Sequence, residues 1–388
     1  MTHVFQVAEG KEILEGKITD VYFVRTLKIL KSEHIDCAVR AEFVAKKLPD
    51  NWPWAVLTGL EEVSHILTRL PVKARAMREG TVFYPNEPVL EIEGSYLDFC
   101  LYETAILGLL CQATGIATKS SRFKKLCGHR LLVSFGVRRM HPSVAPMIER
   151  NAFVGGCDGV SVAKSGEIIG RDPMGTVPHA LILCIGSTVE ALKAFDRVLE
   201  PEINRVALVD TFNDEKFECL NVAGALGSKL YAVRFDTPSS RKGDFLSILE
   251  ECRWELDLRG FEHVKFFVSG GLQEEDIVRL NPVADAFGVG TSISSAPVVD
   301  FSMDIVEVNG QPRAKRGKLS GAKRVLRCPK CHKDKVVPCG QSIENCACGE
   351  RYYDVLLPFV EDGKVIAEIS KPEEIRKYVL AQVADLAL

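Results

Sequence analysis

The sequence lacks three features that would each assign it to a broad class of protein. It has no excess of positive charge, since 49 Lys and Arg stand against 52 Asp and Glu, and this argues against a protein built mainly to coat nucleic acid. It has no run of about 18 apolar residues, so we expect no membrane span. Its first residues, MTHVFQVAEGKEIL, lack the basic-then-apolar order of a signal peptide, and we expect a cytoplasmic protein.

Cysteine is plentiful but shows no sign of a disulfide framework. Eight of the 13 cysteines stand singly in apolar segments, as Cys100, Cys111 and Cys184 do. In a chain without a secretion signal, such residues are expected to be reduced members of the core. The other five gather between Cys328 and Cys348.

Length and composition predict two or three domains with large cores, since the chain has 388 residues, 46% of them apolar. Residues 1–113 indicate an α+β domain, which residues 299–326 and 353–388 are expected to complete. The elements expected here are a helix or strand-helix edge at 20–30, a helix at 61–70, two short strands within 81–94 joined by a turn at 84–88, an apolar helix at 97–111 and a strand at 299–308.

Between residues 114 and 298, apolar β-rich runs alternate with helical segments. Strands separated by helices pair in parallel, and nearly continuous apolar strands have both faces covered. We therefore predict an α/β fold with an irregular parallel (β/α) barrel; an open doubly wound sheet is the alternative. The strand candidates are 131–135, 205–210, 230–236, 263–271 and 284–291, and the helices lie near 215–226, 243–258 and 274–280.

Polar residues and glycines follow four of these strands at their carboxyl ends. In a barrel such ends open on one face, where the active site is built, whereas an open sheet would gather them at a switch point. Glycine loops after the last two strands match the usual phosphate site of barrels, which favours the barrel. The residues are Asp210, Arg234, Asp236, Ser269, Gly270, Gly271, Gly290 and Thr291.

A second group of polar residues lies between 134 and 186. Arg138 and Arg139 stand just before His141, glycines surround Asp158, and His179 opens an apolar run. Adjacent arginines suit a substrate with several phosphate oxygens, because the guanidinium fork binds such oxygens bidentately. The alternative is a surface turn with solvated arginines.

The segment 327–352 predicts a metal site. Cys328-x-x-Cys331 and Cys346-x-Cys348 are two pairs about 15 residues apart, a spacing typical of tetrahedral thiolate sites that zinc fills best. Iron, a disulfide, and ligation by Cys339 or His332 are the alternatives. We predict a structural zinc knuckle without a catalytic role, since four protein ligands leave no open position.

The basic segment 311–327 carries seven Lys and Arg and no acid. A nucleic-acid arm is conceivable, and zinc ribbons often contact nucleic acid, so a zinc-ribbon nucleic-acid-binding protein on a barrel scaffold is the hypothesis from another class. We favour a solvated linker or a wall near the phosphates, because the whole chain is acidic.

These residues together suit phosphoribosyl transfer. Arginines would bind a leaving pyrophosphate, glycine loops a terminal phosphate, and carboxylates an oxocarbenium-like centre or Mg²⁺. An aldolase-type barrel is the competitor, but it requires a Schiff-base lysine at a strand end, and Lys164 is the nearby candidate.

Several motifs carry a resemblance that covers nearly the whole chain. The sequence resembles nicotinate phosphoribosyltransferase, in its prokaryotic form with a C-terminal cysteine zinc knuckle. The motifs are TDVYF (19–23), SFGVRRMHP (134–142), GGCDGVSVAK (155–164), GTVPHA (175–180), VDTFND (209–214), VRFDTPS (233–239), VSGGL (268–272) and GVGTS (288–292).

The resemblance implies a role for each candidate residue and an ATP-coupled synthesis of nicotinate mononucleotide and pyrophosphate. His179, which ATP would phosphorylate, belongs with Asp210, Arg234 and Asp236 to the catalytic group. Tyr22 would stack on the pyridine ring from a neighbouring subunit, which predicts a homo-oligomer. The remaining substrate-binding residues are Arg138, Arg139, His141, Asp158, Ser269, Gly270, Gly271, Gly290 and Thr291. Quinolinate is the rival substrate; nicotinamide is less favoured in so short a chain.

Overall fold

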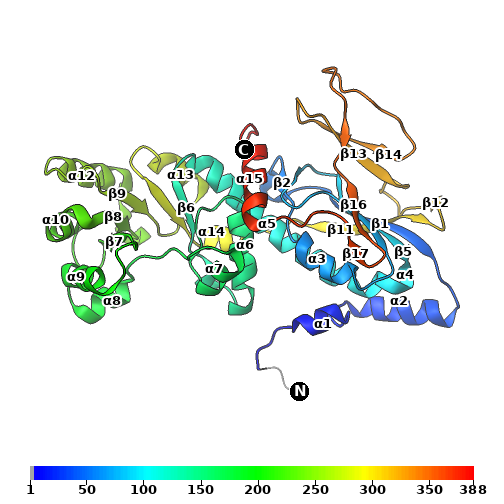
Figure 1. The fold of residues 1–388 in the computed structure, drawn as a ribbon, viewed down its shortest axis with the longest axis horizontal. Helices are drawn as coiled ribbons and strands as arrows, with labels where there is room; N and C mark the ends of the chain where they lie inside the picture. Colours follow the sequence, from blue (N-terminus) through cyan, green and yellow to red (C-terminus); the bar gives the residue numbers. More distant parts are fainter. Residues whose placement is uncertain (1–3) are drawn as a thin grey trace. The chain divides into compact units, whose positions relative to one another are not determined.

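The computed structural model describes residues 4–388 (Figure 1) and divides into two compact units. Unit 1 comprises the chain up to Thr118 together with Pro297–Leu388, and unit 2 comprises Lys119–Ala296. The chain passes from unit 1 into unit 2 within a single helix, Glu103–Cys127 (α5).

Unit 1 is an α+β unit built on a seven-stranded sheet. The strands of unit 1, which also form a three-stranded and a two-stranded sheet, are β1 Ala38–Ala45, β2 Ala55–Val56, β3 Lys73–Ala76, β4 Val82–Phe83, β5 Pro88–Ser95, β11 Phe301–Val308, β12 Gln311–Pro312, β13 Lys323–Arg327, β14 Asp334–Pro338, β15 Tyr353–Asp354, β16 Leu357–Glu361 and β17 Lys364–Val365. Its helices are α1 Gly10–Leu14, α2 Val21–Ser32, α3 Leu60–Leu67, α4 Tyr96–Phe99, the first part of α5, and α15 Pro372–Val383, with short 3₁₀ turns at Pro49–Asn51 and Cys100–Tyr102.

The large sheet has the order β12-β11-β1-β5-β3-β16-β17. Strand β1 pairs antiparallel with β11 and β5, so the residues around 301–308 lie beside the N-terminal part of the chain. The two strands expected within 81–94 both form but pair with different partners, β4 with β2 and β5 with β1 and β3. Buried side chains such as Phe43, Phe83 and Phe99 form the core.

A small three-stranded sheet in the order β14-β13-β15 carries the cysteine cluster. Strands β13 and β14 form an antiparallel hairpin with Arg327 opposite Asp334. Arg327 donates to both carboxylate oxygens of Asp334, and its Nη2 also donates to the carbonyl oxygen of Val82. This buried ion pair ties the hairpin to β4.

Unit 2 is an α/β unit with a five-stranded parallel sheet. Its strands are β6 Leu131–Ser134, β7 Arg205–Leu208, β8 Leu230–Phe235, β9 Lys265–Val268 and β10 Ala286–Val289. Its helices are the end of α5, α6 Ala145–Val154, α7 Ala163–Ile169, α8 His179–Ile185, α9 Thr188–Val198, α10 Glu215–Leu226, α11 Ser239–Lys242, α12 Phe245–Asp257, α13 Glu274–Leu280 and α14 Thr291–Ser294. The 3₁₀ turns are η3 Val137–Arg139, η4 Pro142–Val144 and η5 Gly227–Lys229.

The strand order β6-β10-β9-β8-β7 is parallel throughout and confirms the predicted fold class. The chain steps between neighbouring strands from β7 to β10, and the first strand lies beside the last, as in a barrel. The ladder does not close in the part of the chain that is described: beyond β6 it continues only as a single bridge between Val133 and Gly159. The connection from β6 to β7 is mainly helical, so it contains no strand that could pair with both β6 and β7 and close the sheet.

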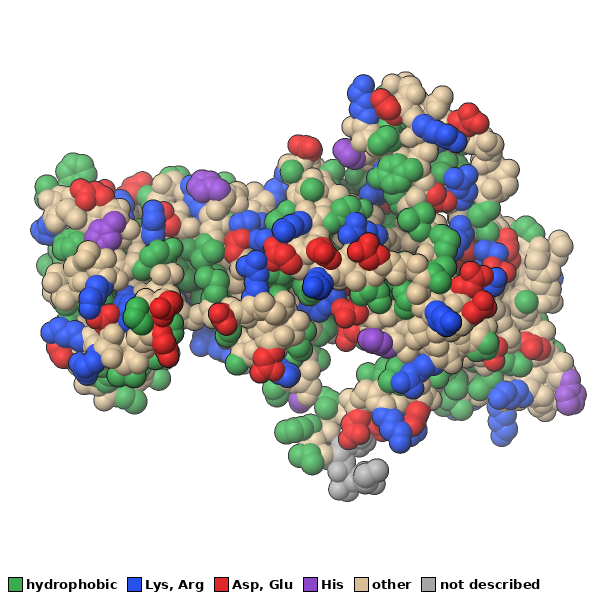
Figure 2. Space-filling view, in the orientation of Figure 1, with side chains coloured by type: hydrophobic (Ala, Val, Ile, Leu, Met, Phe, Trp, Pro, Cys, Tyr) green, Lys and Arg blue, Asp and Glu red, His purple; other side chains and the backbone are tan. Residues whose placement is uncertain are grey.

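One helical stretch, Tyr96–Cys127, is long and apolar enough by length and composition to cross a membrane, but half of its most apolar window is buried inside the protein. A buried core helix meets the same criterion, so this is weak support for a span. On the face shown in Figure 2, Lys and Arg side chains are interspersed with Asp and Glu, and no field of one sign dominates.

Candidate active site and metal centre

The carboxyl ends of the unit 2 strands surround a cavity of about 1000 Å³. Parallel strands end at the same edge of a sheet, so the residues that follow them converge. The lining includes the predicted residues Arg138, Arg139, Arg234, Asp236, Ser269, Gly270, Gly271, Gly290 and Thr291. Residues that follow four of the five strands, β6, β8, β9 and β10, therefore meet in one site, whereas the loop after β7 with Asp210 does not contribute to the lining.

Arg234, at the end of β8, is the most fully engaged side chain in this cavity. Its Nε donates to Ser269 Oγ at 2.9 Å, its Nη1 donates to Thr176 Oγ1 at 2.8 Å, and its Nη2 lies 3.2 Å from Asp236 Oδ1. The guanidinium also stands 5.1 Å from the centre of the Phe135 ring. These contacts hold the planar fork in one orientation before any ligand arrives, which is how an arginine discriminates a phosphate or carboxylate.

His179 lies between two carboxylates at the first position of α8. Its Nε2 is 3.8 Å from Asp210 Oδ2 and 3.7 Å from Asp236 Oδ2, while its Nδ1 lies 2.9 Å from Thr211 Oγ1. The histidine side chain is 40% exposed. A ligand can therefore reach the imidazole while the two acids and the hydroxyl orient it.

Asp210 is the buried member of this cluster, with a side chain only 3% exposed. Burial raises the pKa of its carboxyl, while the nearby His179 opposes the rise and Asp236 adds to it. Its Oδ1 makes no hydrogen bond within the described chain. A buried carboxylate oxygen without a partner suits Mg²⁺, which prefers oxygen ligands.

The glycine loops allow close approach of a ligand to the backbone. Gly270 and Gly271 have φ of +90° and +70°, which favours glycine over other residues. An added Cβ at Gly136 would lie 2.4 Å from the carbonyl oxygen of Gly290. The loops after β6 and β10 are thus packed backbone against backbone at the cavity wall.

Three predicted substrate-binding residues do not line this cavity. Asp158 accepts a hydrogen bond from the Leu132 N–H and from Lys124 Nζ, both at 2.8 Å, which ties α5 to β6. His141 begins the η4 turn, and its Nδ1 accepts from the Ser143 N–H. Tyr22 belongs to unit 1, on α2, where it is 54% exposed. Their roles toward substrate stay predictions.

Two lining residues, and one lysine outside the lining that contacts it, were not singled out from the sequence. Thr176 and Phe135 contact Arg234, and both lie in motifs already quoted, GTVPHA and SFGVRRMHP. Lys242 donates to the Gly270 carbonyl oxygen at 2.6 Å, and burial lowers its pKa. Its only sequence signal is a basic residue a few positions after Asp236, which is too common to be informative.

The four cysteines predicted to bind metal come together beside the β13–β14 hairpin. The Sγ atoms of Cys328, Cys331, Cys346 and Cys348 all lie within 4.8 Å of one another, with separations of 3.4 Å for Cys328–Cys348 and 3.5 Å for Cys331–Cys346. A tetrahedral zinc with bonds of about 2.3 Å sets sulfur atoms about 3.8 Å apart, so the cluster fits this ion. Cys339, the spare candidate, is exposed and lies near Arg75 instead.

Comparisons with known proteins agree with this architecture. Family profiles of the quinolinate phosphoribosyl transferase N-terminal and C-terminal domains match residues 20–114 and 116–304. Nicotinate phosphoribosyltransferase pncB1 of Mycobacterium tuberculosis is 30% identical over 402 aligned positions, which cover 92% of this chain and 88% of that protein. The chain belongs to the nicotinate phosphoribosyltransferase family.

Solved structures extend the likeness to the full length. The crystal structure of nicotinate-nucleotide pyrophosphorylase from Pyrococcus furiosus has 52% identity and a TM-score of 0.98, with 100% of both chains covered. Human nicotinic acid phosphoribosyltransferase has a TM-score of 0.72 over 95% of this chain and 94% of that chain, at 18% identity, and shares the fold. This family member therefore keeps the family architecture along its whole described length.

Proposed function

We propose that this protein transfers a phosphoribosyl group from phosphoribosyl pyrophosphate to nicotinate, giving nicotinate mononucleotide and pyrophosphate. The ring nitrogen of nicotinate forms a bond to C1′ of the ribose, and the bond from C1′ to the pyrophosphate oxygen breaks, with the electron pair leaving on pyrophosphate. The observation that carries the proposal is the pre-oriented Arg234 fork beside Asp236 and two glycine loops in one cavity. His179 and Asp210 adjoin Asp236 but are not among the lining residues.

The distribution of charge in the cavity supports this reaction. Arg138, Arg139 and Arg234 line one cavity and offer cationic forks to the phosphate and carboxylate groups of the two substrates. Asp236 and Asp210 provide negative charge near C1′, where positive charge develops as the glycosidic bond breaks. Mg²⁺ bound with phosphoribosyl pyrophosphate would be held by the same carboxylates and would neutralise the leaving pyrophosphate.

We infer that His179 accepts a phosphoryl group from ATP. Its exposed imidazole, flanked by Asp210, Asp236 and Thr211, has the surroundings of an activated nitrogen nucleophile. The imidazole would take the γ-phosphoryl group and release ADP, and water would then hydrolyse the phosphohistidine to phosphate. Net ATP hydrolysis would in this way accompany turnover.

The test is product formation by the purified protein. Phosphoribosyl pyrophosphate, Mg²⁺ and nicotinate are incubated with and without ATP, and the nucleotides are separated by chromatography. We expect nicotinate mononucleotide, in greater yield with ATP, and we expect His179→Ala to lose the ATP-dependent gain. Absence of any mononucleotide from metal-replete protein would contradict the transferase proposal, whereas an unchanged gain in His179→Ala would contradict only the role of the histidine.

Quinolinate is a second candidate substrate, because both matching family profiles carry its name. Its transfer would also release CO₂. A dicarboxylate needs more basic groups around the ring, and the described lining of the cavity contains three arginines and no lysine. We therefore favour nicotinate, and a parallel incubation with quinolinate separates the two reactions by the release of CO₂.

Tyr22 is proposed to complete the site from a second copy of the chain. It lies on α2 among other exposed apolar residues, including Val21, Val24 and Ile29, and such a helix face suits burial between subunits. We expect the protein to be a homo-oligomer in solution. Tyr22→Ala should preserve this oligomer and raise the KM for nicotinate.

A further inference from the structure

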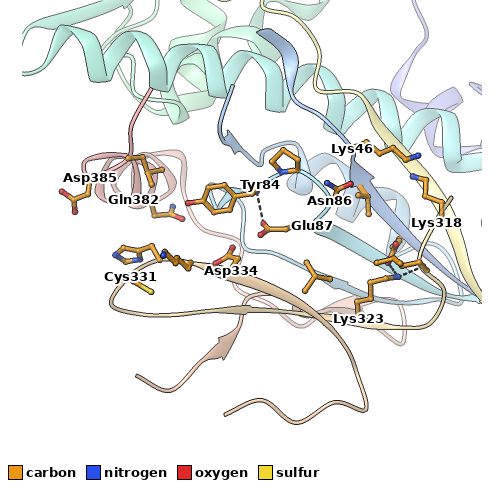
Figure 3. A pocket seen from close by; sticks show the side chains of 18 of the residues that line it. Lys46, Tyr84, Asn86, Glu87, Lys318, Lys323, Cys331, Asp334, Gln382 and Asp385 are labelled. Carbon is orange, nitrogen blue, oxygen red and sulfur yellow. Dashed lines mark hydrogen bonds and ion pairs between the residues drawn. The ribbon is translucent and has the colours of Figure 1, made fainter. Parts of the chain in front are cut away.

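A second large cavity lies entirely within unit 1. It has a volume of about 950 Å³, which is within the range of small-molecule sites. Four separate parts of unit 1 line it: the end of β1, the turn after β4, the region from Gly317 to Val336 that contains β13 and the β13–β14 loop, and the end of α15 (Figure 3). The reaction proposed above uses none of its residues.

Three lysines give this cavity unneutralised positive charge. Lys46, Lys330 and Lys333 line it and are exposed, and within residues 4–388 no carboxylate lies at ion-pair distance from any of them. By contrast, Lys323 and Lys318, which also line the cavity, are paired with Glu42 and Asp304. Lys330 and Lys333 belong to the β13–β14 loop, whereas Lys46 follows β1, and Figure 3 shows Lys46 and Cys331 at opposite ends of the cavity.

The acids of the cavity do not cancel this charge. The side chain of Asp334 is 2% exposed and already forms a two-pronged ion pair with Arg327. Glu87 is 5% exposed, and burial, with the charge of Asp334 as the next cause, raises its pKa to about 8. A mostly protonated Glu87 adds no charge at pH 7. Among the lining residues, Asp385 is the one exposed acid.

The remaining lining offers a flat ring and a loop set by the metal centre. Tyr84 is half-buried, and its backbone N–H donates to Glu87 Oε2 at 2.9 Å. In the view of Figure 3 the Tyr84 ring lies between Gln382 and Glu87. Cys331, a predicted zinc ligand, lines the cavity beside two of the free lysines. The metal therefore determines where those lysines stand.

We propose that the unit 1 cavity binds a phosphorylated small molecule of nucleotide size. Its phosphates contact Lys330 and Lys333 beside Cys331, and its flat ring packs against Tyr84. Lysine ammonium groups suit phosphate as point charges, and a ring on an aromatic side chain adds contact without requiring a particular base. Because one wall is the metal-binding loop, binding and metal retention are linked, and each strengthens the other.

The location is tested by affinity labelling of the full-length, zinc-loaded protein. ATP whose ribose is oxidised to the dialdehyde forms a Schiff base with a nearby lysine, and borohydride reduction fixes it for peptide mapping. We expect label on Lys330 or Lys333, suppressed by excess unmodified ATP. Lys47 and Lys335 are the matched controls, since both are exposed neighbours that lie outside the lining. Equal label on the controls, or label that ATP does not suppress, would overturn the proposal.

The contacts are tested by titration of paired variants. Lys330→Ala combined with Lys333→Ala should lower the affinity of this site for ATP about tenfold or more, with Lys47→Ala combined with Lys335→Ala changing it less than twofold. Pyrophosphate should compete more weakly than ATP, because it lacks the ring. Competition by a single-stranded RNA at concentrations below those needed for ATP would replace the proposal with nucleic-acid binding.

The link to the metal gives an independent readout. The rate at which a chromophoric chelator removes zinc should fall when ATP is present, and this protection should vanish in the Lys330/Lys333 variant but persist in the Lys47/Lys335 variant. Equal zinc release with and without saturating ATP would contradict the linkage.

Discussion

The planar fork of Arg234 yields the sharpest quantitative prediction. Arg234→Lys keeps the charge but places one ammonium where three donors now point in three directions, toward Ser269, Thr176 and Asp236. A single ammonium can replace about one of these contacts, so about two are lost. Hydrogen bonds that involve a charged group contribute about 1.5–3 kcal/mol each. The predicted loss of about 3–6 kcal/mol corresponds to a fall in kcat/KM of about 10²- to 10⁴-fold.

The assay is steady-state formation of nicotinate mononucleotide at varied phosphoribosyl pyrophosphate, with circular dichroism to confirm folding. Arg253 provides a matched control in the same unit: it donates to the carbonyl oxygens of Val264 and Phe261 and stands 4.7 Å from the centre of the Phe266 ring, but it does not line the cavity. Arg253→Lys should lower thermal stability and leave kcat/KM nearly unchanged. A folded Arg234→Lys protein within about threefold of the parent activity would refute the reasoning.

Three further predictions concern the cavity wall, the metal centre and a buried acid. Gly136→Ala should destabilise the protein by about 1–3 kcal/mol and weaken phosphoribosyl pyrophosphate binding, because the new Cβ would lie 2.4 Å from the carbonyl oxygen of Gly290. Gly175→Ala is the control, since its Cβ would meet nothing within 4 Å. Thermal melts and KM values compare the two variants. Cys348→Ser should lose bound zinc, measured by elemental analysis, while Cys339→Ser should retain it. Folding raises the pKa of Glu87 from 4.5 to about 8, so the folded protein binds more protons than the unfolded chain between these pH values. The free energy of unfolding should therefore fall as the pH rises from 4.5 to 8. Urea titrations should show this fall in the parent and not in Glu87→Gln, and parallel curves of stability against pH for the two proteins would contradict the prediction.

The strands of unit 2 could be predicted because they are short apolar runs that are buried on both faces. All four residues of β7 and of β10 are buried, and no polar alternation is available to confuse the pattern. The convergence of Arg234, Asp236 and Ser269 followed from the same pattern, since parallel strands end at one edge. The closure of the sheet could not be predicted, because it depends on whether the chain between β6 and β7 pairs with either edge, and single residues such as Gly159 carry no signal for that.

Asp158 shows that the fold supplies partners which a local motif does not reveal. In the sequence it stands among glycines, in a setting typical of ligand-binding turns, yet its carboxylate contacts Lys124 and the Leu132 backbone. The first of these partners lies 34 positions away. Because only the fold brings α5 alongside this turn, the contact with Lys124 could not be predicted from the residues next to Asp158 in the sequence. Thr176 is the converse case, an ordinary hydroxyl that gains importance because Arg234 reaches it.

The ion pairs of the basic segment 311–327 bear on the nucleic-acid hypothesis. Its seven positive charges suggest a cationic surface, but five of them form ion pairs with acids from other parts of unit 1. The pairs are Lys315 and Lys318 with Asp304, Lys323 with Glu42, Arg324 with Asp354, and Arg327 with Asp334. Paired charges have little attraction left for a polyanion, because a phosphate would have to displace a carboxylate already in place. The unpaired lysines of unit 1 that line its cavity, Lys46, Lys330 and Lys333, lie outside this segment. A cavity of bounded volume suits a compact phosphorylated ligand better than an extended strand.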